Sequence, residues 1–202
     1  MSNLTRMSSG DRRAAILDAA VKLFSERGFR GATTRALAEA VGVTEPVLYE
    51  HFKSKRELYA AIVERKSQEG MARAIVLLEP LAKAKNDRAL LTELGQFMLN
   101  NSAEDQTYRR LLLSVALEDP DLGAMFYRRQ RCGGEALARY IEERIRDGVF
   151  RPVDPALAAR AFLGMIAYHG MTELLYRDDF LKGSHREIVE QMVDLFLKGI
   201  SK

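Results

Sequence analysis

Residues 28–58 read GFRGATTRALAEAVGVTEPVLYEHFKSKREL, and this stretch decides the fold. Thr33 or Thr34 can cap a helix that runs over 34–41. Gly42 supplies a tight turn, and Thr44 can cap a second short helix over 45–51. Pro46 falls in the first turn of that helix, where a missing N–H costs nothing. Two short helices joined by a glycine turn form a helix-turn-helix, so the stretch predicts DNA binding.

Helical periodicity extends through the rest of the chain, and signals for β-hairpins are missing. Capping residues, Gly28 and Pro80 set the remaining expected helices at about 11–27, 54–78, 87–100, 106–117, 120–146, 155–176 and 185–197. The predicted fold class is therefore all-α, with about nine helices. We expect an N-terminal three-helix helix-turn-helix domain over 1–53 and a C-terminal helical domain for effector binding and dimerisation over 54–202. The helix over 54–78 would connect the two domains.

Composition narrows the class of protein further. The chain has 202 residues, of which 47% are hydrophobic, enough for one or two domains with a real core. Cys132 is the only cysteine, so no internal disulfide can form, and a reducing cytosol fits. The sequence lacks the long apolar run that a membrane span needs, and its first ten residues lack an apolar signal segment.

Positive charge is concentrated in the part of the chain that holds the helix-turn-helix. Residues 1–66 contain 12 Lys+Arg and 8 Asp+Glu, a balance of +4, whereas 67–202 contain 19 and 20, a balance of −1. An excess of cations at this end is what binding to phosphates requires. A solvated basic surface would show the same imbalance, so charge alone leaves both interpretations open.

The helices over 155–176 and 185–197 are apolar over more than one stripe. Such helices must be buried on several sides, and the other helices of one chain are too few to cover both. We therefore expect them to pack against their copies in a homodimer, as a four-helix bundle. Burial inside the monomer is the alternative. The expected interface residues are Phe162, Ile166, Met171, Leu174, Val189, Met192, Val193 and Phe196.

The positions from Thr33 to Leu58 carry a specific family resemblance. The run Thr-Thr-Arg-x-Leu-Ala-x-x-x-Gly-Val-x-x-Pro-x-Leu-Tyr-x-His-Phe-x-x-Lys-x-x-Leu closely resembles the DNA-binding segment of the tetracycline-repressor (TetR) family of bacterial regulators. The match covers about 50 residues, and the rest of the chain is similar only in length and helix plan. The resemblance implies a bacterial cytoplasmic protein that is associated with the nucleoid when bound to DNA.

DNA contacts are expected to divide into two groups. Hydroxyl, phenol, imidazole and amine groups near helix ends can hold phosphates, and for Lys55 the family resemblance implies this contact through its backbone amide, its side chain or both. The phosphate group comprises Thr33, Thr34, Tyr49, His51 and Lys55, and the base-reading group comprises Arg35, Thr44, Glu45, Pro46 and Val47. For Glu45, a favourable contact with the helix dipole is the alternative role.

The C-terminal domain is expected to hold a largely apolar small-molecule effector. The expected pocket residues are Phe97, Met98, Leu112, Met125, Phe126, Arg129, Tyr140, Phe162, Met165 and His169. Arg129 falls on an apolar stripe, where it would serve as a pocket cation, form a buried ion pair, or reach water from the edge of the stripe. His169 and Glu173 have chelating spacing, but two ligands do not make a site. We therefore expect neither a metal site nor a cofactor.

The leading functional hypothesis is a ligand-responsive, homodimeric, sequence-specific transcriptional regulator, a repressor that a small molecule releases from a pseudo-palindromic operator. Its partners would be double-stranded operator DNA, a second copy of the chain and the effector, and no membrane. The alternative is a sequence-tolerant DNA-binding or adaptor protein of the same fold without an effector. An enzyme is disfavoured because no catalytic triad spacing, His-Glu-x-x-His motif or phosphate-binding glycine loop is found.

Overall fold

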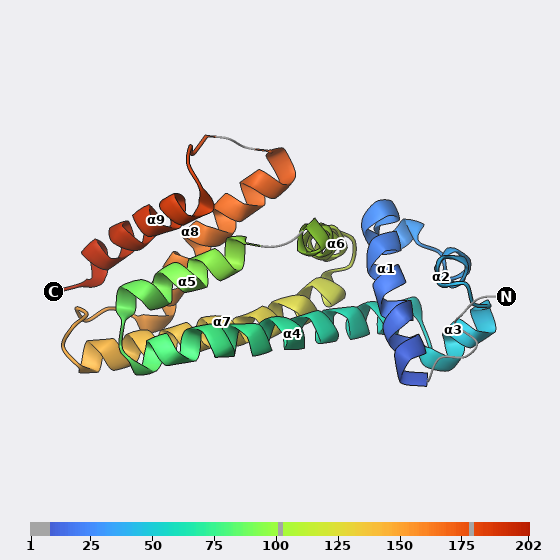
Figure 1. Ribbon diagram of the computed structural model, residues 1–202, viewed down its shortest axis with the longest axis horizontal. Helices are drawn as coiled ribbons and strands as arrows, with labels where there is room; N and C mark the ends of the chain where they lie inside the picture. Colours follow the sequence, from blue (N-terminus) through green and yellow to red (C-terminus); the bar gives the residue numbers. More distant parts are fainter. Residues whose placement is uncertain (1–8, 101–102, 178–179) are drawn as a thin grey trace. The chain divides into compact units, whose positions relative to one another are not determined.

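A computed structural model describes residues 9–100, 103–177 and 180–202 of the chain. These residues form nine helices and no strand longer than a single isolated bridge between Phe150 and Ser201, which confirms the all-α prediction (Figure 1). The helices are α1 (Ser9–Gly31), α2 (Thr34–Val41), α3 (Glu45–His51), α4 (Lys55–Lys83), α5 (Asp87–Leu99), α6 (Ala103–Glu118), α7 (Pro120–Arg146), α8 (Pro155–Tyr176) and α9 (His185–Ile200).

The first compact unit comprises residues 1–68 and 103–128. Within it, α1 packs against both α2 and α6, and α2 packs against α3. Ile16, Ala20 and Phe24 of α1 are completely buried, as the spacing along this helix predicts. Gly28 has φ 69° and ψ 170°, so it interrupts the regular helix where the sequence predicts its end. This unit therefore holds the whole helix-turn-helix segment.

The second compact unit comprises residues 69–102 and 129–202. Its centre is formed by α5, α8 and α9, each of which packs against the other two (Figure 1). Phe162 and Ile166 of α8 and Val189 and Val193 of α9 are completely buried in one apolar cluster. Leu137 and Ile141 of α7 join the same cluster.

The two compact units are interleaved along the chain, because α6 packs on α1 and so joins the N-terminal unit. The predicted domains over 1–53 and 54–202 follow the order of the helices along the chain. That order does not show that α6 packs on α1. The functional division between DNA binding and effector binding stays a prediction.

Local capping signals place the helix ends well. Thr33 accepts a hydrogen bond from the Ala36 amide, and Asp154 accepts one from the Leu157 amide. Ser184 and Glu187 form a complete capping box at α9. At α4, Ser54 caps the Glu57 amide, whereas the Glu57 carboxylate accepts from the amide of Lys53 rather than of Ser54. Ser8 and Asp11 have the spacing of a capping box before α1, but Ser8 lies outside the described residues.

The prediction that the fourth helix ends near residue 78 is wrong, because α4 continues through Pro80 to Lys83. A proline inside a helix leaves the carbonyl four residues earlier, here that of Val76, without its usual donor. Val76 is 77% exposed and Pro80 is also exposed, so water can hydrogen-bond to that carbonyl. The structural cost of Pro80 is therefore small enough for the helix to continue.

Most of the expected dimer residues are buried by their own chain. Phe162, Ile166, Val189 and Val193 have no exposed surface, and Leu174 is almost fully buried. The four fully buried side chains therefore offer no surface to a partner, and the interface on α8 and α9 as a whole stays a prediction. Met171, Met192 and Phe196 are half-buried. The reason for the error is that α8 is apolar almost all round, so periodicity does not show which face meets α5 and α9.

Two helical glycines give opposite predictions for stability. A Cβ added at Gly95 would lie 2.6 Å from Cγ1 of Val189 in the core, whereas a Cβ at Gly133 meets nothing within 4 Å. We expect Gly95→Ala to lower the free energy of unfolding by about 1–3 kcal/mol, the usual cost of overpacking. Gly133→Ala should raise it by about 0.5–1 kcal/mol through helix propensity. Denaturant unfolding of both variants checks this, and a stable Gly95→Ala variant would contradict the packing of α5 on α9.

Candidate DNA-binding interface

The turn between α2 and α3 depends on a left-handed residue. Gly42 has φ 76° and ψ 31°, a conformation that favours glycine. The Val43 amide donates to the Ala38 carbonyl at 2.9 Å, and the Gly42 amide donates to the Glu39 carbonyl at 3.1 Å, so the last carbonyls of α2 are satisfied. This geometry ends α2 within one residue and starts α3 three residues later, as the sequence predicts.

A buried apolar core fixes the angle between α2 and α3. Leu37, Leu48, Phe52 and Leu58 are each at most 3% exposed and belong to one cluster with α1. Beneath them, the rings of Phe24, Phe29 and Tyr59 pack with centroid distances of 5.6–6.4 Å. The outer sides of α2 and α3 thus stand on a rigid base, which a recognition surface requires.

The two threonines at the start of α2 differ in their roles. Thr33 accepts from the Ala36 amide at 3.1 Å, so its hydroxyl proton stays available for a phosphate oxygen. The Thr34 hydroxyl donates to the Glu45 carboxylate at 3.0 Å. This bond links the first turns of α2 and α3. In the absence of DNA, Glu45 therefore positions the two helices relative to each other.

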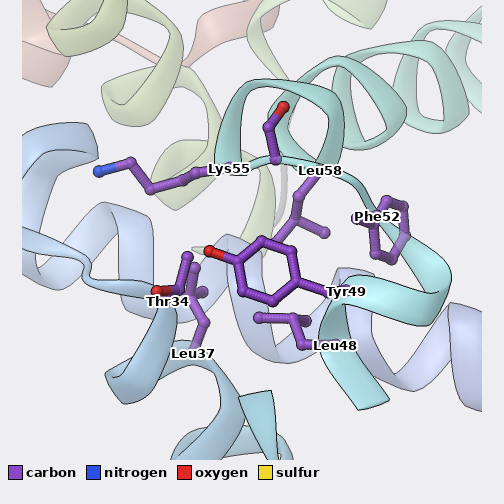
Figure 2. Close-up of a pocket in the computed structure, with 8 residues that line it drawn as sticks. Thr34, Leu37, Leu48, Tyr49, Phe52, Lys55 and Leu58 are labelled. Atoms are coloured by element: carbon purple, nitrogen blue, oxygen red, sulfur yellow. The ribbon is translucent and has the colours of Figure 1, made fainter. Parts of the chain in front are cut away.

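A small depression separates α2 from α3 and the start of α4, and Figure 2 shows Thr34, Leu37, Tyr49 and Lys55 around it. The space is about 10 Å³, room for about one water molecule, so it is a surface feature and not an effector pocket. Tyr49 is 46% exposed at its edge. An exposed phenol on a buried apolar base is well placed to donate to a phosphate. His51, at the end of α3, is half-buried.

The side chain of Lys55 is engaged inside the protein. Its ammonium donates to the Phe29 carbonyl at 2.7 Å and lies 4.6 Å from the centre of the Phe29 ring. Burial lowers the pKa of Lys55, and the nearby Glu118 carboxylate partly opposes that shift. The Lys55 amide is among the first of α4 and has no partner inside the helix. Of the two contacts that the family resemblance implies, the structure therefore favours the backbone amide.

The base-reading candidates lie on the outer surface of the helix-turn-helix. Arg35 is exposed and pairs with Glu39 one turn later at 3.0 Å, an exposed pair that DNA can replace at little cost. Thr44 occupies the N-cap position of α3 but makes no capping hydrogen bond through its side chain, which corrects the expected cap. Pro46 is exposed and Val47 is half-buried. Thr44 can therefore use its hydroxyl on a ligand.

Sequence reasoning missed one cation near the end of α3. The exposed Arg13 of α1 lies 4.5 Å from the centre of the Phe52 ring, directly after α3. The Arg13 guanidinium over the Phe52 ring adds positive charge next to the residue that lies between His51 and Lys53 in the sequence. No spacing rule could have found it, because 39 residues separate Arg13 from Phe52.

Within the same unit, ion pairs and hydrogen bonds link the end of α1 and the start of α4 to the residues at and just after the end of α6. Glu118 accepts from the Arg30 amide at 3.2 Å, and Arg56 pairs with Asp119. Asp18 of α1 pairs with Arg65 of α4. The end of α1 and the start of α4 are therefore held on either side of the helix-turn-helix by polar contacts.

The expected effector residues fall into different parts of the structure. Leu112, Met125 and Phe126 belong to the apolar cluster of the first unit. Met98, Phe162 and Met165 belong to that of the second. Phe97 is half-buried. The side chain of Arg129 lies outside those that the structure describes.

Tyr140 and His169 have polar partners in the second unit. The Tyr140 hydroxyl donates to Asp87 at 2.6 Å, and Arg144 binds the same carboxylate in bidentate fashion at 2.8 and 3.1 Å. Burial and the bond to Asp87 raise the pKa of Tyr140. The Tyr140 hydroxyl is therefore used structurally, whereas His169 lies beside Glu173.

Comparisons with known proteins identify both parts of the chain. The family described as "Bacterial regulatory proteins, tetR family" matches residues 16–62. A second family, "AefR-like transcriptional repressor, C-terminal domain", matches residues 89–199, more than half of the chain. Among the described helices, none is both long and apolar enough to cross a membrane.

Two curated relatives match along most of their length. The nucleoid occlusion factor SlmA of Marinobacter nauticus is 30% identical, over 85% of this chain and 87% of the relative. The transcriptional regulator AcrR of Shigella flexneri is 28% identical, over 98% and 94%. The crystal structure of AibR in complex with isovaleryl coenzyme A and operator DNA has a TM-score of 0.64 at 22% identity, covering 91% of this chain and 97% of that one.

Proposed function

Because this chain belongs to the TetR family of bacterial transcriptional regulators, we propose that it acts as a homodimeric, sequence-specific repressor that a small molecule releases from its operator. The observation that carries the proposal is the helix-turn-helix itself. Its core is rigid, and Thr33, Tyr49 and Arg35 are left on the outside. Two copies would place their α3 helices in successive major grooves, about 34–36 Å apart.

The proposed dimer surface is the exposed face of α8. Leu157 and Tyr168 are each 67% exposed, and Ala161 and Gly164 between them are also exposed. Spacings of four, three and four residues put all four on one side of the helix. A stripe of apolar and small residues allows close packing of a second helix. This stripe replaces the buried residues that the sequence suggested for the same helix.

The proposed effector domain is the second unit, which has more helices than DNA binding needs. Inside its largely apolar core, Thr92 and Gln96 of α5 are each only 6% exposed. The amide nitrogen of Gln96 has no hydrogen-bond partner among the described residues, and a buried donor of this kind needs an acceptor. We assign it to an acceptor group on an otherwise apolar effector. The AibR complex shows that one protein of this fold holds a coenzyme A thioester.

A second candidate function has support from one comparison. The relative with 30% identity is named as a nucleoid occlusion factor and not as a transcriptional regulator. For this chain the equivalent function would be sequence-tolerant DNA binding or an adaptor role. A ratio of affinities for selected and random DNA near unity at 150 mM salt would favour it, whereas a ratio of about 10³ or more would favour the repressor.

Two substitutions separate phosphate contacts from base contacts. We expect Tyr49→Ala to weaken binding about tenfold on every sequence, because a phosphate contact carries no sequence information. Arg35→Ala should relax the preference at one base pair in each half-site, with a loss of about 1–3 kcal/mol of discrimination. Site selection from a random duplex library, followed by anisotropy titration, measures both effects. The opposite pattern would overturn this division of roles.

A further inference from the structure

A cluster of two histidines and one glutamate lies in the second unit, away from the helix-turn-helix residues in the sequence. His169 and Glu173 are one turn apart on α8, and His185 is the first residue of α9. One ligand atom from each residue lies within 4.8 Å of the other two. The sequence showed only the first two ligands, because the third comes from the next helix. We propose that these three side chains bind a divalent transition-metal ion of the zinc type.

The distances suit such an ion. Oε1 of Glu173 lies 3.2 Å from Nε2 of His185 and 3.7 Å from Nε2 of His169. Ligands bound to zinc at 2.0–2.1 Å with tetrahedral angles are about 3.4 Å apart. The two observed separations lie on either side of that value, so small side-chain rotations would complete the coordination. The fourth position would be left to water or an exogenous ligand.

Hydrogen bonding fixes which nitrogen of His185 faces the cluster. Asn100 donates through Nδ2 to Oε1 of Gln96 at 2.8 Å, so its Oδ1 faces Nδ1 of His185 at 3.3 Å. Nδ1 of His185 must then carry the proton, and in the neutral ring Nε2 presents a lone pair. An acceptor that binds the other ring nitrogen and sets the tautomer in this way is the usual support of a metal-binding histidine.

With both imidazoles neutral, the cluster holds a carboxylate and no cation. Nε2 of His185 and the Glu173 carboxylate are then both acceptors, and they face each other at 3.0–3.2 Å. Such a pair repels unless a proton or a metal ion lies between the two atoms. The surroundings of His169 favour the metal ion over the proton. It is only 7% exposed, and its Nε2 has no hydrogen-bond partner among the described residues. A proton on His185 leaves that atom unpaired, whereas a metal ion satisfies all three ligands.

The donor set indicates the class of metal. Imidazole nitrogens prefer zinc and its neighbours among the first-row transition metals, whereas magnesium and calcium prefer oxygen ligands. The site would join α8 to the start of α9, with Asn100 at the end of α5 as the supporting residue. It is separate from the DNA contacts, so metal binding can be tested without an operator.

The test is a titration of the full-length protein after removal of metals by a chelator. Zn²⁺ binding is followed by calorimetry, and Co²⁺ serves as a spectroscopic probe of the coordination. We expect one ion per chain, with no competition from Mg²⁺ or Ca²⁺. His185→Ala and Glu173→Gln should each weaken binding about a hundredfold or more, and Asn100→Ala about tenfold while keeping the stoichiometry.

Controls exclude other ligands and loss of folding. Glu190→Gln removes an exposed carboxylate from α9 and should bind the metal as the parent does. Cys132→Ser serves as the background, because the exposed thiol could bind zinc by itself. Circular dichroism verifies that each variant is folded, and His185→Ala carries the test if a substitution of the buried His169 unfolds the protein. The proposal is overturned if the parent protein binds Zn²⁺ no more tightly than the folded His185→Ala variant does, or if it binds no stoichiometric amount. Either result leaves the repressor hypothesis intact.

Discussion

Phe162→Ala is expected to lower the free energy of unfolding by about 3–5 kcal/mol, the usual cost of removing a buried aromatic ring. Phe162 has no exposed surface, and its ring packs against that of Phe196 with centroids 5.2 Å apart. Removing the ring would leave a cavity at the junction of α5, α8 and α9. Chemical denaturation at one fixed protein concentration measures the loss, because the proposed dimerisation would make stability depend on concentration.

Tyr176→Ala provides the matched control on the same helix. Tyr176 is 73% exposed, so its removal should change the free energy of unfolding by less than about 0.5 kcal/mol. A loss below about 1 kcal/mol for Phe162→Ala would mean that α8 turns this side chain outward. The interface predicted from the sequence would then be right and the buried core described here wrong.

Gly164→Arg is expected to separate the proposed dimer without unfolding the chain. A Cβ at Gly164 meets nothing within 4 Å, and arginine is about 1 kcal/mol better than glycine in a helix. In the dimer, the arginine would bring an unpaired charge between two packed helices, at a cost of about 3–5 kcal/mol. The dissociation constant of the dimer should rise by about a hundredfold or more. Sedimentation velocity over a range of concentrations measures this constant.

Operator affinity should fall together with dimerisation. Two linked half-site contacts give an affinity for the duplex about 10²–10⁴ times that of one contact, through effective concentration alone. A monomer loses this gain in affinity. Gly133→Arg is the matched control, since Gly133 is likewise a helical glycine with open space around it, on α7. If both variants stay dimeric, or if both dissociate, α8 is not the specific contact surface.

Local sequence signals were enough for the helix-turn-helix. The bounds of α2, α3 and α8 agree with the expected ranges, because Thr33 and Asp154 cap the starts of α2 and α8, Pro46 fits the first turn of α3, and Gly42 marks where α2 ends. The predicted end of the fourth helix before Pro80 is wrong, because a proline often ends a helix but does not always do so. Where the freed carbonyl lies on an exposed turn, water can replace the missing hydrogen bond.

Features that depend on distant partners could not be predicted. Nothing in the local sequence shows that the Thr34 hydroxyl meets Glu45 or that the Lys55 ammonium meets the Phe29 carbonyl. The buried face of α8 could not be predicted for another reason. Its apolar residues surround the helix, so only the contacts with α5 and α9 decide which of them are covered. His185 joins His169 and Glu173 by the same kind of tertiary packing.

The proposed repressor needs two copies of α3 to read one duplex together. Sedimentation equilibrium of the protein with a duplex chosen by site selection tests this most directly. We predict a complex of two chains per duplex, on half-sites whose centres are about 10–10.5 base pairs apart. A complex that holds a single chain at full occupancy, with undiminished affinity, would contradict it.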